Sequence, residues 1–150
     1  MSQRLVRAKT KIRDAAIPFR VPEPAEWQER VAFVLDAIYS AYTTGWESLM
    51  DVSSTHHALA GDAIAIGRTL VQLMPAEPEA LGLLALMLHC EARRAARYAN
   101  NGEFLPLDRQ DTALWSRPMI DEAEAHLQQA AAFKRMGRYQ LEAAIQSIHA

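Results

Sequence analysis

Apolar residues recur at steps of three and four positions along most of the chain, which is the period of an amphipathic α-helix. The pattern predicts helices over about residues 2–15, 25–45, 56–73, 78–98, 117–133 and 139–149. No segment of any length alternates apolar and polar residues as a half-buried strand would. The sequence therefore predicts an all-α fold of antiparallel helical hairpins, arranged as a tetratricopeptide-like array or as a bundle.

Prolines and glycines divide this pattern into segments. Residues 17–24 (IPFRVPEP) contain three prolines and cannot continue a helix, because proline lacks an amide donor and fixes its own φ. We interpret this segment as a linker between a short helix, residues 1–16, and an all-helical domain, residues 25–150. Gly45 is expected to end the first helix of that domain. The short connection between Leu73 and Pro78 predicts that the helices on either side of it are antiparallel.

One helix is apolar on every side and should lie at the centre of the domain, since such a helix has to be covered by its neighbours. Its core sequence, residues 81–88 (LGLLALML), is too short to cross a bilayer. The residues expected to be buried are Leu81, Leu84, Leu86 and Leu88, together with Ile64 of the preceding helix. The segment 100–111 (NNGEFLPLDRQD) breaks the helical pattern and is expected to form a long loop or a small hairpin.

The final helix carries an apolar face that no later element of the sequence covers, as if an array had been cut there. The residues expected to be partly exposed on it are Leu141, Ala144, Ile145 and Ile148. Uncapped ends of helical arrays tend to self-associate, so we expect a homodimer or a swapped contact.

Charge is distributed unevenly along the 150 residues, although the net charge is only -2. The first 20 residues carry six basic side chains against Asp14 alone, a net charge of +5, which leaves -7 on residues 21–150. The basic N-terminal segment suits contact with phosphates, whereas the acidic remainder would be repelled by them. The single cysteine, Cys90, excludes an internal disulfide and fits a reducing cytoplasm. No apolar segment follows the basic start, so we expect no secretory signal there.

Candidate catalytic and metal-binding residues do not form a recognisable set. The groups with suitable residue types are His56–His57, His89–Cys90–Glu91 and Glu122–His126. Consecutive residues point in different directions on a helix, and the last pair lacks a third ligand, whereas zinc needs three or four. No nucleophile elbow, phosphate-binding glycine loop or dinucleotide fingerprint is present. We therefore expect no enzyme activity, no metal and no cofactor.

Two charged clusters are candidates for interaction. The first ends the central helix and faces an acidic loop; its residues are Glu91, Arg93, Arg94, Arg97, Asp108, Arg109 and Asp111. Its arginines either complement the negative end of the helix dipole or form a pocket that binds the loop. The two roles are compatible with each other. The second cluster lies on the N-terminal helix and consists of Arg4, Arg7, Lys9, Lys11 and Arg13. It is either a solvated face or half of a helix-turn-helix, because Leu5, Ala8, Ile12 and Ala15 leave an apolar stripe beside it.

Several segments resemble a known family. QRLVRAKTKIRDAAIPFRVP (residues 3–22) looks like the end of region 4 of an extracytoplasmic-function (ECF) RNA polymerase sigma factor, with the linker that follows it. The body resembles the all-helical, tetratricopeptide-like C-terminal extension of such factors. The segments that match are DAIAIGR (62–68), PAEPEALGLLALMLHCEARRAAR (75–97), LPLDRQDTALW (105–115) and GRYQLEAAIQSIHA (137–150).

The resemblance implies a regulatory, protein-interaction domain that acts in transcription initiation in the cytoplasm. It implies RNA polymerase core and promoter DNA as partners of the full-length factor, a further protein partner for the helical domain, and no membrane. The basic cluster of the N-terminal helix would be the remnant of a DNA-reading helix. The sequence departs from the family in three ways. Residues 42–46 (YTTGW) stand where the family has an FNEGY-like run, and residues 108–111 read Asp-Arg-Gln-Asp where the family has Asp-Gln-Asp-Arg. The 150 residues also contain no match to sigma region 2.

Two other functions fit the same pattern. A free-standing helical-repeat scaffold would bind protein partners alone. A small-molecule sensor would need a cavity of a few hundred Å³ between its helices, of roughly the size that ligand sites have.

Overall fold

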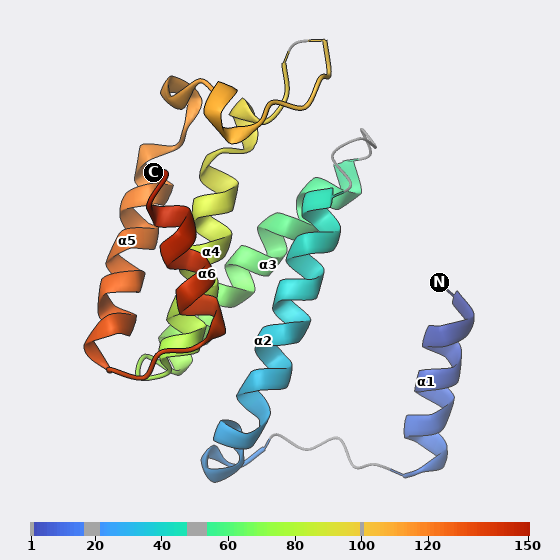
Figure 1. Ribbon diagram of the computed structural model, residues 1–150. Coiled ribbons are helices and arrows are strands. Elements are labelled where there is room, and N and C mark those ends of the chain that lie inside the picture. The colour runs from blue at the N-terminus through green and yellow to red at the C-terminus, as the bar shows by residue number, and fades with distance from the viewer. Residues whose placement is uncertain (1, 17–21, 48–53, 100) are drawn as a thin grey trace. The chain divides into compact units, whose positions relative to one another are not determined.

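A computed structural model describes residues 2–16, 22–47, 54–99 and 101–150, and Figure 1 shows the order of their helices. The chain divides into two compact units, Met1–Ala32 and Phe33–Ala150. Within the described residues the only β structure is an isolated bridge between Tyr98 and Phe104, so the fold is all-α as the periodicity predicts.

The first unit contains helix α1, Ser2–Asp14, and the beginning of α2, Pro24–Glu47. Local hydrogen bonds set the start of α2. The Glu26 carboxylate accepts from the backbone amide of Glu23 at 2.9 Å, and the Trp27 indole donates to the carbonyl of Pro22 at 3.0 Å. Residues 17–21, which make up most of the predicted linker, lie outside the described part of the chain.

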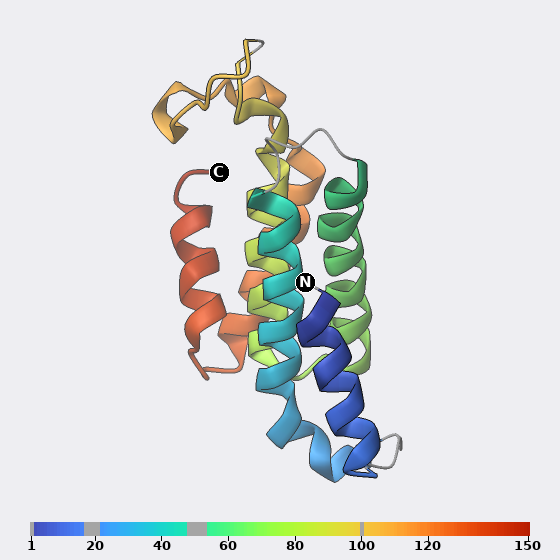
Figure 2. The ribbon, with the colours of Figure 1, turned by 90° about the vertical axis from the view of Figure 1, so that its right-hand side faces the viewer.

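The second unit is a bundle in which successive helices run in opposite directions (Figures 1 and 2). After the C-terminal part of α2 come α3 (Ser54–Leu73), α4 (Pro78–Ala92), α5 (Arg117–Ala132) and α6 (Arg138–Ser147). Helix α4 packs against α3, α5 and α6. The short connection between α3 and α4 makes them antiparallel, as the sequence predicts.

Helix α4 is the centre of the bundle because every residue from Ala80 to His89 is buried. The five predicted core residues are confirmed: Leu81, Leu84, Leu86, Leu88 and Ile64 are all at most 4% exposed. A polar contact also joins α2 to α4. From α2, the Tyr42 hydroxyl donates to the carbonyl of Met87 at 3.2 Å, and burial raises the pKa of this tyrosine.

Helix α6 begins at a carboxylate supplied by α4. Glu79 accepts from the backbone amides of Tyr139 and Gln140, at 3.0 and 3.3 Å, and from the Gln140 side chain at 3.1 Å. A carboxylate is the favoured partner for the free amides of a helix N-terminus. The Tyr139 hydroxyl also donates to Asp36 of α2 at 2.7 Å, so side chains of α4 and α2 both bind the first turn of α6.

Two predicted helix ends were wrong. Helix α2 passes through Gly45, which is buried in its last turn, and ends at Glu47. One glycine costs a helix only about 1 kcal/mol, and the stacking of Trp46 on Tyr42, one turn earlier, favours continuing it (ring centroids 5.7 Å apart).

Helix α4 was predicted to continue to Tyr98 but ends at Ala92, where a short 3₁₀ helix, η2 (Arg94–Ala96), takes over. The carbonyl of Ala92 accepts from the amide of Ser116 at 2.9 Å, and that of Arg97 from the amide of Leu105 at 2.8 Å. Backbone amides of the segment between α4 and α5 therefore donate to carbonyls near the end of α4. A small hairpin with the Tyr98–Phe104 bridge follows. A hairpin was one of the two structures predicted for this part of the chain, the other being a long loop.

The outer face of α6 is exposed as the sequence predicts. Leu141 is 52%, Ile145 57% and Ile148 79% exposed, and Ala144 is exposed beside them. We call these four residues the α6 strip. Their spacing places them on one side of the helix, so they form a continuous apolar surface.

We predict that this chain self-associates through the α6 strip, because joining two strips removes exposed apolar surface from water. Light scattering should show dimers whose fraction rises with concentration. Ile145→Lys should restore the monomer, whereas Ile66→Lys, at a similarly exposed position of α3, should not. A strict monomer at millimolar concentration would contradict this prediction.

Candidate functional site

Among the residues that the structure describes, no group of three or more His, Cys, Asp or Glu side chains could hold a metal ion. The side chains of His56 and His57 lie outside the described ones. The thiol of Cys90 lies within α4, and burial raises its pKa above the ordinary value, with Arg93 and Arg97 acting in the opposite direction. A thiol that is disfavoured as thiolate is a poor nucleophile.

The basic cluster on α1 is exposed to solvent. The side chains of Arg7, Lys9, Lys11 and Arg13 are exposed, while that of Arg4 is not among those described. Arg13 lies 3.7 Å from Asp14, an exposed pair that contributes little to stability. The predicted apolar stripe is also open to solvent at Ile12, which is 54% exposed. Side chains on this helix are thus available for phosphates, as the sequence suggests.

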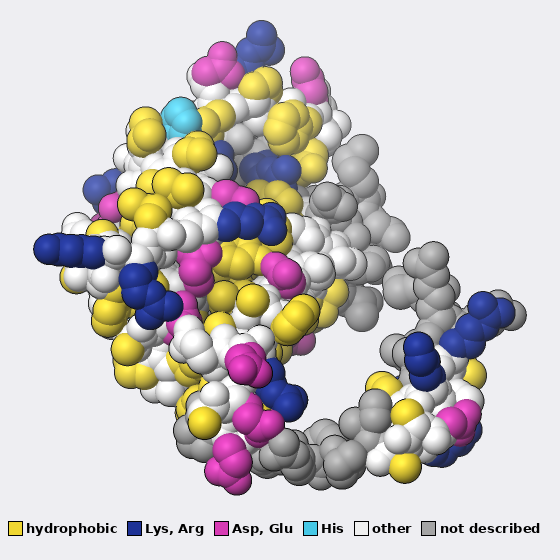
Figure 3. Space-filling view, turned by 60° about the horizontal axis from the view of Figure 1, so that its bottom comes forward, with side chains coloured by type: hydrophobic (Ala, Val, Ile, Leu, Met, Phe, Trp, Pro, Cys, Tyr) yellow, Lys and Arg dark blue, Asp and Glu magenta, His cyan; other side chains and the backbone are white. Residues whose placement is uncertain are grey.

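We predict that this chain binds duplex DNA weakly, without sequence preference and with steep salt dependence. Phosphate contacts by the α1 cluster supply attraction but no sequence information, whereas specific reading needs a recognition helix seated by a partner helix. The view in Figure 3 shows acidic and basic side chains mixed over the larger body, with no continuous basic field. Charge reversal at Arg7 and Lys11 should remove the binding, whereas Arg109→Glu should not. Nanomolar, sequence-selective binding at physiological salt would contradict the prediction.

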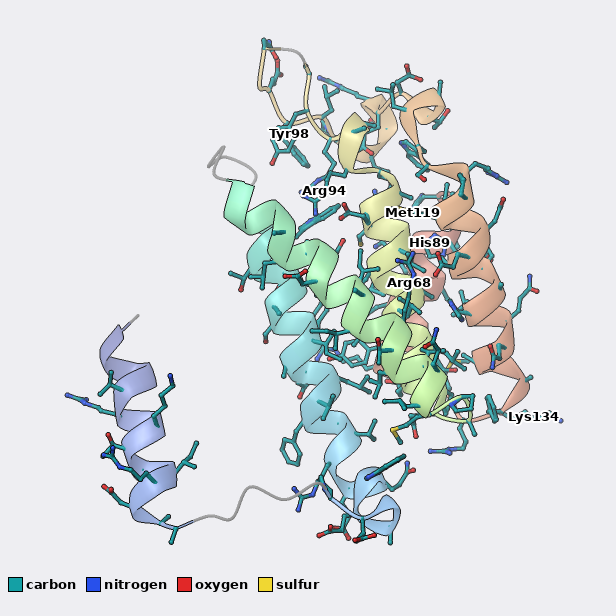
Figure 4. All side chains as sticks on the ribbon, turned by 180° about the vertical axis from the view of Figure 1, so that it is seen from behind. Arg68, His89, Arg94, Tyr98, Met119 and Lys134 are labelled. Atoms are coloured by element: carbon teal, nitrogen blue, oxygen red, sulfur yellow. The ribbon has the colours of Figure 1, made fainter. Side chains whose placement is uncertain are left out.

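Three arginines at the end of α4 have different sets of partners, although Arg94 and Arg97 share the Trp46 ring. Arg94 (Figure 4) makes two hydrogen bonds with the carboxylate of Glu91, both 2.6 Å long. Its guanidinium also lies 5.1 Å from the centre of the Trp46 ring. Both side chains of this ion pair are more than four-fifths buried, so solvent screens it only partly.

The guanidinium of Arg97 is surrounded by aromatic rings. It lies 4.1 Å from the centre of Trp46, 5.6 Å from that of Phe104 and 5.8 Å from that of Tyr98. These distances are in the range of cation–π attraction. Within the described residues Arg97 has no carboxylate partner, and its pKa is lowered chiefly by burial.

The third arginine connects α4 to the loop before α5. Arg93 donates to the Gln146 side chain of α6 at 2.5 Å, and its guanidinium lies 5.9 Å from the centre of the Trp115 ring. Trp46 and Trp115 were not predicted as site residues. The signal that could have found them is an arginine-rich helix end with few carboxylates nearby, because guanidinium groups in that setting stack on aromatic rings.

The acidic loop does not bind these arginines in the way the sequence suggested. Among the described residues no ion pair joins Arg93, Arg94 or Arg97 to Asp108 or Asp111. Asp108 and Arg109 lie exposed on the 3₁₀ helix η3 (Leu107–Arg109). Asp111 instead caps η4 (Thr112–Leu114) by accepting from the amide of Ala113 at 2.9 Å. The physical reason is that capping an adjacent amide satisfies this carboxylate locally.

Unsatisfied polar atoms collect at this end of the bundle. Six buried side-chain nitrogen and oxygen atoms in the described structure lack a hydrogen bond, and two of them belong to His89. The other four are Nη1 of Arg94, Nη1 of Arg97, Oε1 of Gln110 and Nε1 of Trp115. We call the region formed by Glu91, Arg93, Arg94 and Arg97 with Trp46, Gln110 and Trp115 the arginine end. Buried polar groups without partners are costly, so such a concentration needs an explanation.

A groove lies beside the arginine end, between the η3–η4 segment and the end of α6. Two adjoining hollows of about 480 and 490 Å³ make it up, and both are lined by Thr112, Trp115 and His149. Gln110 lines the second hollow, whereas Arg117 and Ile120 line the first. The indole nitrogen of Trp115 and the amide oxygen of Gln110 are buried atoms, so the lining of the groove does not expose them.

His89 is the other buried group with unused polar atoms (Figure 4). Its Nε2 lies 3.2 Å from Oε1 of Glu124 on α5, outside hydrogen-bond geometry, and the Ser147 hydroxyl of α6 donates to the same carboxylate. Burial lowers the pKa of His89, while Glu124 opposes this change and Arg93 supports it. Burial also lowers the pKa of the partly buried His126.

We predict that stability falls as the pH is lowered from 7.5 to 5.5. In this range the unfolded chain binds protons at positions 89 and 126 before the folded chain does, so acid favours unfolding. The slope has an upper limit of about 1.4 kcal/mol per pH unit for each histidine. Urea unfolding should show a shallower pH dependence in His89→Gln, whatever its absolute stability. An unchanged slope would contradict the assignment.

None of the helices in the described residues has the length and apolar character that a membrane span requires. Residues 30–131 match the family model described as a family of unknown function, DUF6596. An uncharacterized protein of Rhizobium meliloti (strain 1021) is 41% identical over all 150 residues, which span 36% of its length.

No solved structure matches the chain. The arginine end and nearly all of the groove's lining fall within the residues that match the family model. The match extends from the first third of α2 to the end of α5 and covers more than half of the chain. The chain therefore belongs to the family of unknown function DUF6596.

Proposed function

We propose that this chain is the regulatory, protein-binding part of an ECF-type RNA polymerase sigma factor, and that the arginine end with its groove is the docking site. The proposal rests on the resemblance of residues 3–22 to the end of sigma region 4 and of the body to the C-terminal extension of such factors. It places the protein in the cytoplasm, with RNA polymerase core and promoter DNA as partners of the complete factor.

One observation supports the choice of site. The segments 75–97 and 105–115, which carry much of the resemblance, meet at the arginine end. Arg93 of the first lies over Trp115 of the second, and the amide of Leu105 donates to the carbonyl of Arg97. All six buried polar atoms without a hydrogen bond in the described structure lie in these two segments, and four of them are at the arginine end. The groove lined by residues of the second segment is open at this surface, where a docked protein segment could lie.

The length of the relative is compatible with this proposal. The chain spans about a third of the Rhizobium meliloti protein, so that protein has room for further domains. The proposal requires sigma region 2 and the rest of region 4 in the reading frame that precedes residue 1. A frame without them would favour a free-standing helical scaffold.

The test uses the complete protein in its host. Its overproduction should induce a defined set of transcripts, measured by sequencing of 5′ ends. Thr112→Trp places a large side chain in the groove, because Thr112 is exposed and lines both hollows. This variant should lose the induction at an unchanged protein level. The matched variant Thr69→Trp, at an exposed position of α3, should retain it. Equal activity of both variants would contradict the proposed docking site.

The size of the groove supports a second candidate, a small-molecule sensor, since each hollow is within the range of ligand sites. A ligand at 100 times its Kd stabilises a folded protein by about 2.7 kcal/mol. Thermal unfolding in the presence of a metabolite library should then show a saturable rise in Tm that Thr112→Trp abolishes. The absence of any such rise would leave the protein-binding function as the better account.

A further inference from the structure

We infer that Arg97 and the aromatic rings around it bind an aspartate or glutamate side chain of a protein partner. This inference rests on the proposed protein-binding function and specifies one contact of the docking site, a carboxylate anchored on a guanidinium. Three observations carry it: an unbalanced positive charge at the arginine end, a free edge of the Arg97 guanidinium that solvent reaches, and rings that hold this guanidinium in place.

The charges of the arginine end do not balance. Glu91 and Arg94 neutralise each other through two hydrogen bonds of 2.6 Å. Arg93 donates to the neutral side chain of Gln146, and Arg97 has no carboxylate partner within the described residues. One carboxylate against three guanidinium groups leaves a net charge of +2 at this place, which an anion from outside can offset.

One edge of the Arg97 guanidinium is free and accessible. Its Nη1 atom is buried, but Nε and Nη2 are not among the buried atoms, and neither makes a hydrogen bond within the described residues. Nε and Nη2 are the two nitrogens with which Arg94 holds both oxygens of Glu91, and with which Arg68 holds both oxygens of Glu122. The same edge of Arg97 therefore has the spacing that a carboxylate needs for two parallel hydrogen bonds.

The rings around Arg97 hold its guanidinium in place before a ligand arrives. Trp46 lies 4.1 Å away, and Phe104 and Tyr98 lie at 5.6 and 5.8 Å. A guanidinium attracted to ring faces keeps its in-plane N–H groups for hydrogen bonds, and a preorganised donor loses little entropy on binding. Burial lowers the pKa of Arg97, because the charged form loses part of its hydration, and a bound carboxylate compensates for that loss.

A single acidic side chain of a protein fits this site better than a polyanion does. Residues 21–150 carry a net charge of -7, which repels the many phosphates of nucleic acid. One carboxylate in direct contact with Arg97 gains the full local attraction and meets little of this repulsion, since salt screens distant charges. Phe104 is 53% exposed and offers apolar surface to the methylene groups that carry the carboxylate.

The test uses two capped peptides that differ in a single group, acetyl-Leu-Glu-Leu-amide and acetyl-Leu-Gln-Leu-amide, with inorganic phosphate as a third probe. All three are compared at pH 7 and the same physiological ionic strength. Indole N–H signals in ¹H–¹⁵N spectra report binding. Trp46 is the reporter, because its ring touches both Arg94 and Arg97, and the indole of Trp27, already bonded to Pro22, provides an internal reference.

The Trp46 signal should shift saturably with the glutamate peptide, with a Kd on the order of 1–10 mM for so small a probe, and the Trp27 signal should not. The glutamine peptide should bind about tenfold more weakly, because it lacks the charge-assisted hydrogen bonds. Phosphate, which has no apolar part, should also bind more weakly. Arg97→Gln should abolish the preference for glutamate, whereas Arg109→Gln, at an exposed position of η3, should retain it. The same spectra establish that each variant is folded.

Three results would overturn the inference: equal affinity of the two peptides for the unaltered protein, an unchanged preference in Arg97→Gln, or phosphate binding as tightly as the glutamate peptide. The last result would mean a site for free anions. Failure of this inference is distinguishable from failure of the proposed function. If the glutamate peptide is not preferred while Thr112→Trp still abolishes transcript induction, the docking function stands and the acidic contact is wrong. If the peptides bind as expected while neither Arg97→Gln nor Thr112→Trp changes induction, Arg97 is a carboxylate site outside sigma activity.

Discussion

Replacing Leu84 with alanine should lower the free energy of unfolding by about 2–5 kcal/mol, the range for truncating a fully buried leucine. Leu84 is 1% exposed and lies on α4, against which α3, α5 and α6 pack. The lost side chain leaves a cavity that these helices cannot close without losing their other contacts. Urea unfolding followed by circular dichroism measures the loss.

The matched control is Leu73→Ala at the end of α3, where the side chain is 63% exposed. This variant should change the stability by no more than about 0.5 kcal/mol, as surface substitutions usually do. A loss below about 0.5 kcal/mol at Leu84 itself would show that the central position of α4 is wrong.

Gly82→Ala should destabilise the protein by about 1–3 kcal/mol, although the same change normally stabilises a helix by about 1 kcal/mol. The reason is the close approach of α6 to α4. A Cβ added at Gly82 would lie 2.7 Å from the backbone nitrogen and 3.0 Å from the Cα of Gln140, and backbone cannot move aside as a flexible side chain can. The two helices would have to separate.

Gly61→Ala on α3 is the control for this change, because a Cβ there meets nothing within 4 Å. It should stabilise the protein by up to about 1 kcal/mol, since only the gain in helix propensity remains. We therefore predict that alanine lowers the free energy of unfolding at Gly82 and raises it at Gly61. A stabilising effect at both would mean that α4 and α6 are farther apart than in this structure.

The sequence alone determined the fold class, the order of the helices and the core. Apolar residues at helical spacing specify a buried face wherever the chain folds, and a segment apolar on every side, such as residues 81–88, can only be central. The exposed α6 strip followed by the same reasoning. Helix starts at Pro24, Pro78 and Arg117 were placed to within a residue or two, because proline and polar capping residues act locally.

The last turns of α2 and α4 could not be predicted, because contacts distant in sequence decide them. Gly45 suggested an end to α2, but tertiary packing buries it. The end of α4 depends on Ser116, which lies 24 positions after Ala92. Its backbone amide donates to the carbonyl of Ala92. Helix propensity is a weak tendency of about 1 kcal/mol or less per residue, which such contacts easily override.

The candidate site was predicted only in part. The sequence singled out the arginines at the end of α4 and the loop opposite them, since unusual runs of charge are visible without a structure. It could not pair them: Asp111 caps its own short helix, while Trp46 and Trp115 take the place expected for carboxylates. Which donors and acceptors remain unsatisfied depends on distances and angles between segments up to about 50 positions apart, and only the tertiary structure fixes these.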